Sequence, residues 1–118
     1  VMIGDDVETI EKEAFAKCKK LEIFMCSSES ELKRVEEAAF YNCPALYIMM
    51  FDDKLEYIGA NALRGCSSIT YLPLPPSIEE MDVTSLPEPN DNLFLYSFRN
   101  SYADTFGKNV GYNMIYLD

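Results

Sequence analysis

Histidine is absent from the 118-residue sequence, and glycine is scarce at five residues. Without histidine the chain has no Ser-His-Asp or Cys-His catalytic group and no imidazole metal ligand. The five glycines form no glycine-rich loop of the kind that holds a phosphate group. No apolar run reaches about 18 residues, the length that a membrane-spanning helix needs. These absences predict a non-enzymatic protein without a cofactor, without a metal and without membrane insertion.

Positive charge is also scarce, since ten Lys and Arg residues stand against twenty Asp and Glu residues. The formal net charge of −10 disfavours nucleic acid and anionic membranes as partners. The chain has no signal-peptide pattern and opens on "VMIGDDVETI", which is typical of the interior of a fold. We therefore expect a mature or trimmed piece of a longer protein.

Three segments of the chain, residues 7–26, 32–51 and 55–74, align with one another without gaps. They share two aliphatic residues three apart, then a small-plus-large pair, a cysteine three residues later and a Leu or Ile three further on. These positions are Val7/Ile10, Leu32/Val35 and Leu55/Ile58; Ala14-Phe15, Ala39-Phe40 and Ala62-Leu63; Cys18, Cys43 and Cys66; Leu21, Leu46 and Ile69. A period in the range of 20 to 29 residues with spaced aliphatics is typical of a leucine-rich-repeat solenoid.

The spacing between copies is 25 residues (Val7 to Leu32) and then 23 (Leu32 to Leu55). The two extra residues fall in the polar segment 27–31, where an insertion costs little. A fourth, decayed copy begins at Ile78 and has Pro89 at the cysteine position. The chain therefore contains about four coils.

The pattern of Ile, Ala-Phe, Cys and Leu, followed by a short apolar strand, resembles the BspA-like leucine-rich repeat of bacterial surface proteins and some protist proteins. The third copy, "IGANALRGCSSITYLPLPPSIEEM", matches best and includes Pro75, which the first two copies lack. The resemblance covers residues 3 to about 96. It implies an α/β leucine-rich-repeat solenoid, made mostly of short parallel β-strands with helical turns, in coils of 23–25 residues.

The C-terminal segment "NSYADTFGKNVGYNMIYLD" predicts a helix, a turn and a closing strand. Asn100 or Ser101 can cap a helix that runs to Lys108 or Asn109, and Gly111 permits the following turn. Arrays of the family that the repeats resemble often end in this way. We expect residues 1–96 to form the solenoid and residues 97–118 to cap it within the same domain.

The cysteines of the repeat are interpreted as structural. Cys18, Cys43 and Cys66 occupy one repeat position, so they stack about 4.8 Å apart in successive coils. That spacing alone does not exclude a disulfide, but all three point the same way and their number is odd. Four zinc ligands at suitable spacings are lacking. We expect buried thiols, and the same for Cys26 at an inward strand position.

The alternation along the predicted strands "LEIFMC", "LYIMMF" and "ITYLPL" separates inward from outward side chains. The inward sets are Leu21/Phe24/Cys26, Leu46/Met49/Phe51 and Ile69/Leu72/Leu74. The outward residues, predicted to bind a partner, are Ile23, Met25, Ile48, Met50 and Tyr71, with Pro73 beside them and Phe94 or Tyr96 extending the row. The family usually has Ser and Thr there, and an exposed apolar row generally marks an interface.

Acidic residues are expected to surround this row, namely Glu22, Asp52, Asp53, Glu79 and Glu80. Neighbouring carboxylates along a strand or loop diverge, so these dyads predict solvated edges and no glycosidase pair. Two alternatives stay open for the row: a missing segment of the parent protein or a homodimer partner covers it, or a one-residue slip exchanges its inner and outer faces.

The resemblance implies a cell-surface or secreted recognition module that binds a protein, such as a host or extracellular-matrix protein, because members of the family have been linked to adhesion. The alternative is a structural spacer or capping end of a longer repeat array with no ligand of its own. An intracellular protist scaffold ranks behind both. We expect a monomer or a weak homodimer through the apolar row.

Overall fold

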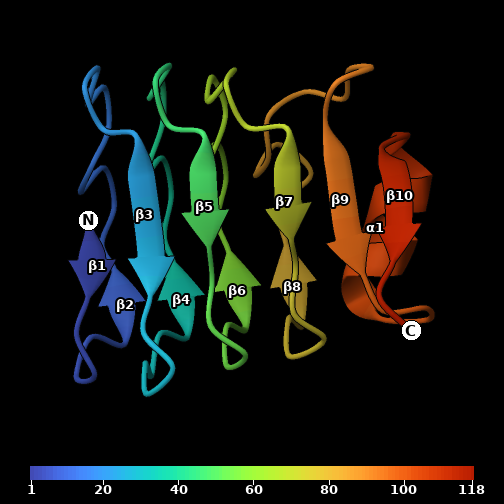
Figure 1. The fold of residues 1–118 in the computed structure, drawn as a ribbon, viewed down its shortest axis with the longest axis horizontal. Helices are drawn as coiled ribbons and strands as arrows, with labels where there is room; N and C mark the ends of the chain where they lie inside the picture. Colours follow the sequence, from blue (N-terminus) through green and yellow to red (C-terminus); the bar gives the residue numbers. More distant parts are fainter.

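The computed structural model describes residues 1–118, which wind into a solenoid of stacked short strands (Figure 1). One row of strands, the first row, comprises β1 (Met2–Ile3), β3 (Ile23–Cys26), β5 (Ile48–Met50), β7 (Tyr71–Pro73), β9 (Phe94–Ser97) and β10 (Asn113–Tyr116). The second row comprises β2 (Thr9–Ile10), β4 (Arg34–Val35), β6 (Tyr57–Ile58) and β8 (Glu80–Met81). The strands of the two rows point in opposite directions in Figure 1, as each coil goes out along one row and returns along the other. The predicted leucine-rich-repeat solenoid is confirmed.

All paired strands are parallel, and equivalent residues of successive coils lie directly beside one another. Ile23 pairs with Ile48, and Tyr71 pairs with Phe94. The second row is one continuous four-stranded sheet, whereas the first row is divided into the sheets β1-β3-β5 and β10-β9-β7. The division lies between β5 and β7, where Pro73 has no backbone N–H to donate to the preceding strand.

The core runs along the axis of the solenoid between the two rows. The second residue of each of β3, β5, β7 and β9 is fully buried, and each second-row strand contributes its last residue. These residues are Phe24, Met49, Leu72 and Leu95 in the first row and Ile10, Val35, Ile58 and Met81 in the second. The predicted inward face is therefore confirmed and the one-residue slip is excluded. Leu21, Cys26 and Phe51, also predicted inward, are only partly buried but pack against this core.

Phenylalanine side chains fill the middle of the first two coils. The rings of Phe15 and Phe40 stack with their centroids 5.2 Å apart, and the edge of Phe24 meets Phe40 at 4.8 Å. Such aromatic pairs contribute about 0.5–1.5 kcal/mol beyond the burial of their area. The repeated Ala-Phe pair therefore places a small residue beside a large one that the next coil covers.

The Ala-Phe segments form successive tight turns and no continuous helix. In the second coil the N–H of Ala39 donates to the carbonyl of Glu36, three residues back, which is the hydrogen bond of a 3₁₀ turn. Ala38 and Asn42 have φ of 56°, so each turn is interrupted before a helix can extend. The N–H of Phe40 donates to the carbonyl of Ala62 in the next coil, so the turns stack in the manner of strands.

A helix and a strand close the C-terminal end. Helix α1 (Tyr102–Val110) begins at Ser101, whose side chain accepts from the N–H of Asp104, and it ends at Gly111, which has φ of 101°. Strand β10 then pairs with β9 at the edge of the first row. The predicted helix with a Ser101 cap, the turn at Gly111 and the final strand are confirmed.

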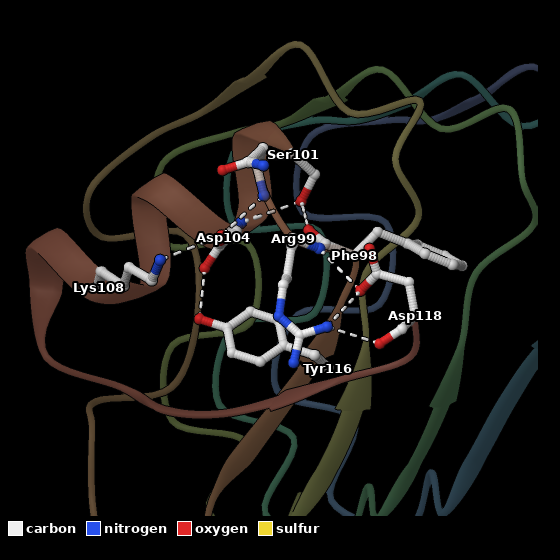
Figure 2. A network of polar contacts seen from close by, with 8 residues as sticks. Phe98, Arg99, Ser101, Asp104, Lys108, Tyr116 and Asp118 are labelled. Atoms are coloured by element: carbon white, nitrogen blue, oxygen red, sulfur yellow. Dashed lines mark hydrogen bonds and ion pairs between the residues drawn. The ribbon is translucent and has the colours of Figure 1, made fainter.

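Asp104 holds the pieces of this cap together (Figure 2). It is 2% exposed, and its carboxylate accepts from the backbone N–H of Asn100 at 2.8 Å and from the hydroxyl of Tyr116 at 2.8 Å. Lys108 lies 3.3 Å away, one helical turn further on. The Asn100 N–H, then the Tyr116 hydroxyl and the Lys108 ammonium, lower the pKa of Asp104 against the effect of burial. Helix α1 and strand β10 are thereby tied to the same carboxylate.

Candidate protein-interaction surface

The outward side chains of the first row, apart from Asn113 on β10, form one apolar surface, which we call the apolar strip. It consists of Met2, Ile23, Met25, Ile48, Met50, Tyr71, Pro73, Phe94, Tyr96 and Ile115. The parallel register aligns these residues in two lines, because equivalent outward positions of successive coils lie side by side. The strip therefore extends across every strand of the first row, and Figure 1 shows the order of these strands from β1 to β10.

All five residues predicted from the sequence to bind a partner lie in this strip. Tyr71 is 44% exposed, while Ile23, Met25, Ile48 and Met50 are partly exposed. Each flanks a fully buried residue on its strand, so side chains pointing outward and inward alternate as expected. The structure thus brings the five together on one face, and whether that face binds a partner stays a prediction.

The structure adds residues at both ends of the strip that the sequence interpretation did not include. Met2 is 67% exposed and pairs with Met25, and Ile115 is 37% exposed and pairs with Tyr96. Met2 stands 23 residues before Met25, so the repeat length was the available signal. Ile115 stands only 19 residues after Tyr96, because β10 belongs to the cap and departs from the period.

Aromatic side chains concentrate at the C-terminal half of the strip. The rings of Tyr71 on β7 and Tyr96 on β9 stack with their centroids 4.4 Å apart, and Phe94 lies beside Tyr71 in the register. Tyrosine offers a large, rigid, amphipathic contact area, and it is enriched among the residues that carry most of the energy of protein interfaces. This half of the strip therefore has the chemistry of an interface centre.

The acidic rim differs from the prediction. Glu22 precedes β3 and Asp52 and Asp53 follow β5, so these three lie at the ends of first-row strands as expected. The placement of Glu79 and Glu80 beside the strip was wrong. Glu80 begins β8 in the second row, where it pairs with Tyr57, because the fourth coil repeats the second-row position of the earlier copies.

The outer face of the second row is polar and internally paired. Its outward residues are Thr9, Arg34, Tyr57 and Glu80. The guanidinium of Arg34 lies 4.2 Å from the ring centroid of Tyr57 and 2.8 Å from the carboxylate of Glu36. The two outer faces of the solenoid therefore differ, and the first row alone carries an apolar one.

Two of the four cysteines, Cys43 and Cys66, are buried thiols whose sulfur atoms are hydrogen-bonded. The thiol of Cys43 donates to the carbonyl of Phe15 at 3.0 Å, and that of Cys66 donates to the carbonyl of Phe40 at 3.1 Å. Both side chains are fully buried, all four cysteines are free, and burial raises the pKa of Cys66 to about 12. The interpretation as structural thiols is confirmed for these two. Cys18 and Cys26 are only partly buried, at the first coil of the stack and at a strand end.

No group of three or more Cys, Asp or Glu side chains is arranged to hold a metal ion. No helix in the structure has both the length and the apolar character needed to cross a membrane. The features of this surface that could act on a partner are thus its apolar side chains and the carboxylates at the strand ends.

Comparisons with known proteins agree with this architecture. The family model of the BspA type leucine rich repeat region matches residues 1–90 in six copies. No curated protein matches the chain. Among solved structures, a leucine rich cell surface protein from Faecalibacterium prausnitzii A2-165 is similar, with a TM-score of 0.75 and 21% sequence identity. That match covers 100% of this chain and 32% of the other, and at this identity it shows the fold alone.

Proposed function

Because the chain belongs to the BspA-type leucine-rich-repeat family, we propose that it is a non-enzymatic protein-recognition module of a cell-surface or secreted protein. The module presents the apolar strip to a protein partner, such as a host or extracellular-matrix protein. The structurally similar protein is itself a leucine rich cell surface protein, which supports the proposed location.

The observation that carries the proposal is the strip itself. A chain with a net charge of −10 places ten apolar side chains on one outer face, at positions that contribute little to its own core. Contiguous exposed apolar surface is unfavourable in water and is typically retained where another molecule covers it. The stacked pair Tyr71 and Tyr96 lies in the middle of the C-terminal half and supplies an anchor of the kind that interfaces favour.

A second function, the capping end of a longer repeat array, is favoured by the closed C-terminal end of the second row. There the hydroxyl of Tyr102 accepts a hydrogen bond at 3.1 Å from the N–H of Met81, the last residue of β8. Residues 97–118 then cap the solenoid of residues 1–96 in one domain, and the partner-binding surface lies elsewhere in the array.

Binding measurements on matched variants test the proposal. Wild-type chain and the double variant Ile48→Ser/Met50→Ser are immobilised and exposed to a panel of purified extracellular-matrix proteins. The control is Val83→Ser, since Val83 is 62% exposed and lies outside the strip. We expect the wild type and the control to capture the same matrix protein, with at least about tenfold weaker capture by the double variant.

Equal capture by all three chains, or no capture by any, would contradict a recognition role for the strip and favour the capping function. Sedimentation of the wild type alone completes the test. A monomer or a weak homodimer is expected, and the homodimer should dissociate in the double variant.

A further inference from the structure

An apolar hollow lies at the C-terminal ends of β5 and β7, directly beside the apolar strip. Its apolar lining includes Met50, Phe51, Pro73, Phe98 and Leu117. Met50 and Pro73 belong to the strip as well, so the hollow is its continuation. Phe98 is 37% exposed and Leu117 is 50% exposed, which leaves apolar surface open to a partner.

One unpaired carboxylate lines the same hollow. Asp53 is exposed and, together with Leu74 and Pro75, lines the hollow. Its carboxylate makes neither a hydrogen bond nor an ion pair in the structure. Its neighbour Asp52 is engaged by the hydroxyl of Ser30 at 2.9 Å and by the backbone N–H of Lys54 at 3.1 Å. Asp53 is therefore the carboxylate that is available to a partner.

The nearby cations are already occupied by other carboxylates. The ammonium of Lys54 lies 2.8 Å from Glu31, and the guanidinium of Arg99 lies 3.6 Å from Asp118. Neither ion pair includes Asp53. The hollow thus combines an apolar floor with a negative charge at its edge, in a chain whose net charge is −10.

We infer that this hollow binds a lysine or arginine side chain of an extended, basic protein segment that lies along the apolar strip. The inference rests on the proposed recognition function and names the class of its partner. The aliphatic stem of such a side chain packs on Met50, Pro73 and Leu117, and its charged head reaches the carboxylate of Asp53. The acidic chain also attracts a basic segment at long range and so speeds the encounter.

Selection from a phage-displayed library of random peptides tests this inference. Peptides of about 12 residues suffice to cross the strip, at about 3.3 Å per residue. Selection uses the full wild-type chain, and the selected peptides are synthesised for affinity measurements. Each is measured against the wild type, Asp53→Asn, the control Asp91→Asn and the double variant Ile48→Ser/Met50→Ser.

Asp91 is a matched control because it is exposed, forms no ion pair and precedes β9, at the opposite end of the first-row strands. We expect the selected peptides to contain a Lys or Arg among apolar residues. Asp53→Asn should weaken binding about three- to tenfold, Asp91→Asn should not, and replacing the peptide's basic residue with citrulline or norleucine should remove the difference. Raising sodium chloride from about 0.15 M to about 1 M should weaken wild-type binding.

Four outcomes overturn the inference. Peptides that require Ile48 and Met50 but carry no basic residue, or that bind Asp53→Asn as well as the wild type, leave the recognition function in place and remove the basic partner. Peptides that bind the double variant normally, or a library that yields no binder, remove both.

Discussion

The hydroxyl oxygen of Tyr102 lies 3.1 Å from the backbone nitrogen of Met81 and accepts its hydrogen bond. The same hydroxyl lies 3.4 Å from the carbonyl oxygen of Met81. Met81 ends β8, the last strand of the second row, so its N–H has no further strand to meet. A side chain of the cap helix thus takes the place of the next coil at Met81, and the N–H at this edge of β8 has a hydrogen-bond partner.

Replacing Tyr102 with Phe should therefore lower the free energy of unfolding by about 1 kcal/mol, since the N–H of Met81 loses its partner. The measurement is urea denaturation followed by circular dichroism. Tyr47→Phe is the control, because Tyr47 is 48% exposed and its hydroxyl makes no hydrogen bond within the chain. Equal stabilities of the two variants would show that the hydrogen bond between the Tyr102 hydroxyl and the N–H of Met81 does not stabilise the edge of β8.

The carboxylate of Asp104 should make the stability of the chain depend on pH in the acid range. Its hydrogen bonds lower its pKa in the folded state, so the unfolded chain binds the proton more readily. The stabilisation is fully present above the unfolded pKa of about 3.9 and is lost as the pH falls through the folded value. Asp104→Asn should be less stable than the wild type at neutral pH, and the difference should shrink on acidification.

Thermal unfolding of both chains at a series of pH values measures this difference. Asp91→Asn, which removes an exposed and unpaired carboxylate, controls for net charge. A gap between wild type and Asp104→Asn that stays constant through the acid range would rule out the ionised form as the source of the stabilisation.

The buried cysteines should be protected from thiol reagents in the native state. Cys43 and Cys66 are fully buried, and because burial raises the pKa of Cys66 to about 12, almost none of it is thiolate at pH 8. We expect Cys18 and Cys26 to be alkylated before these two, and all four to react equally in urea. Mass spectrometry of peptides from native, labelled protein provides the rates. Labelling of Cys66 as fast as Cys18 would contradict its burial.

Gly65 should be intolerant of a side chain. It has φ of 86°, and an added Cβ would clash with the side-chain amide of Asn42 in the preceding coil. Gly65→Ala should lower the free energy of unfolding by about 1–3 kcal/mol. Gly4→Ala provides the comparison, because an added Cβ at Gly4 has no atom within 4 Å. The two variants should differ clearly in urea midpoint. Identical midpoints would contradict the close packing of the turn at Gly65 against the turn at Asn42.

The sequence alone was sufficient to predict the repeating parts of the fold. Phe24, Met49 and Leu72 could be placed inside because strand alternation and the repeat length specify the same face. The cap helix was also recognisable, since Ser101 and Gly111 have distinct backbone roles at its two ends. Local chemistry and periodicity carry this information without any knowledge of distant contacts.

The sequence did not predict the side-chain contacts between the last coil and the C-terminal cap. The contact of Tyr102 with Met81 and the network of Asp104 join segments that have no equivalent in earlier repeats. The placement of Glu80 beside the strip failed because the repeat alignment through Ile78 puts Glu80 at a second-row position, where it pairs with Tyr57. The hollow beside Asp53 arises from the loop after β5 and the C-terminal segment around Leu117, which no pattern connects.

The most direct test of the proposed recognition surface is methionine oxidation with and without a bound partner. Met25 and Met50 lie in the apolar strip, whereas Met49, which precedes Met50 on β5, is fully buried and provides an internal control. Hydrogen peroxide is applied to the wild type alone and to its complex with a matrix protein or selected peptide that it binds, and mass spectrometry quantifies each sulfoxide. We predict oxidation of Met25 and Met50 in the free chain, at least about fivefold slower oxidation in the complex, and an unreactive Met49 in both. Unchanged oxidation of Met25 and Met50 in a saturated complex would show that the partner binds elsewhere and would contradict the account.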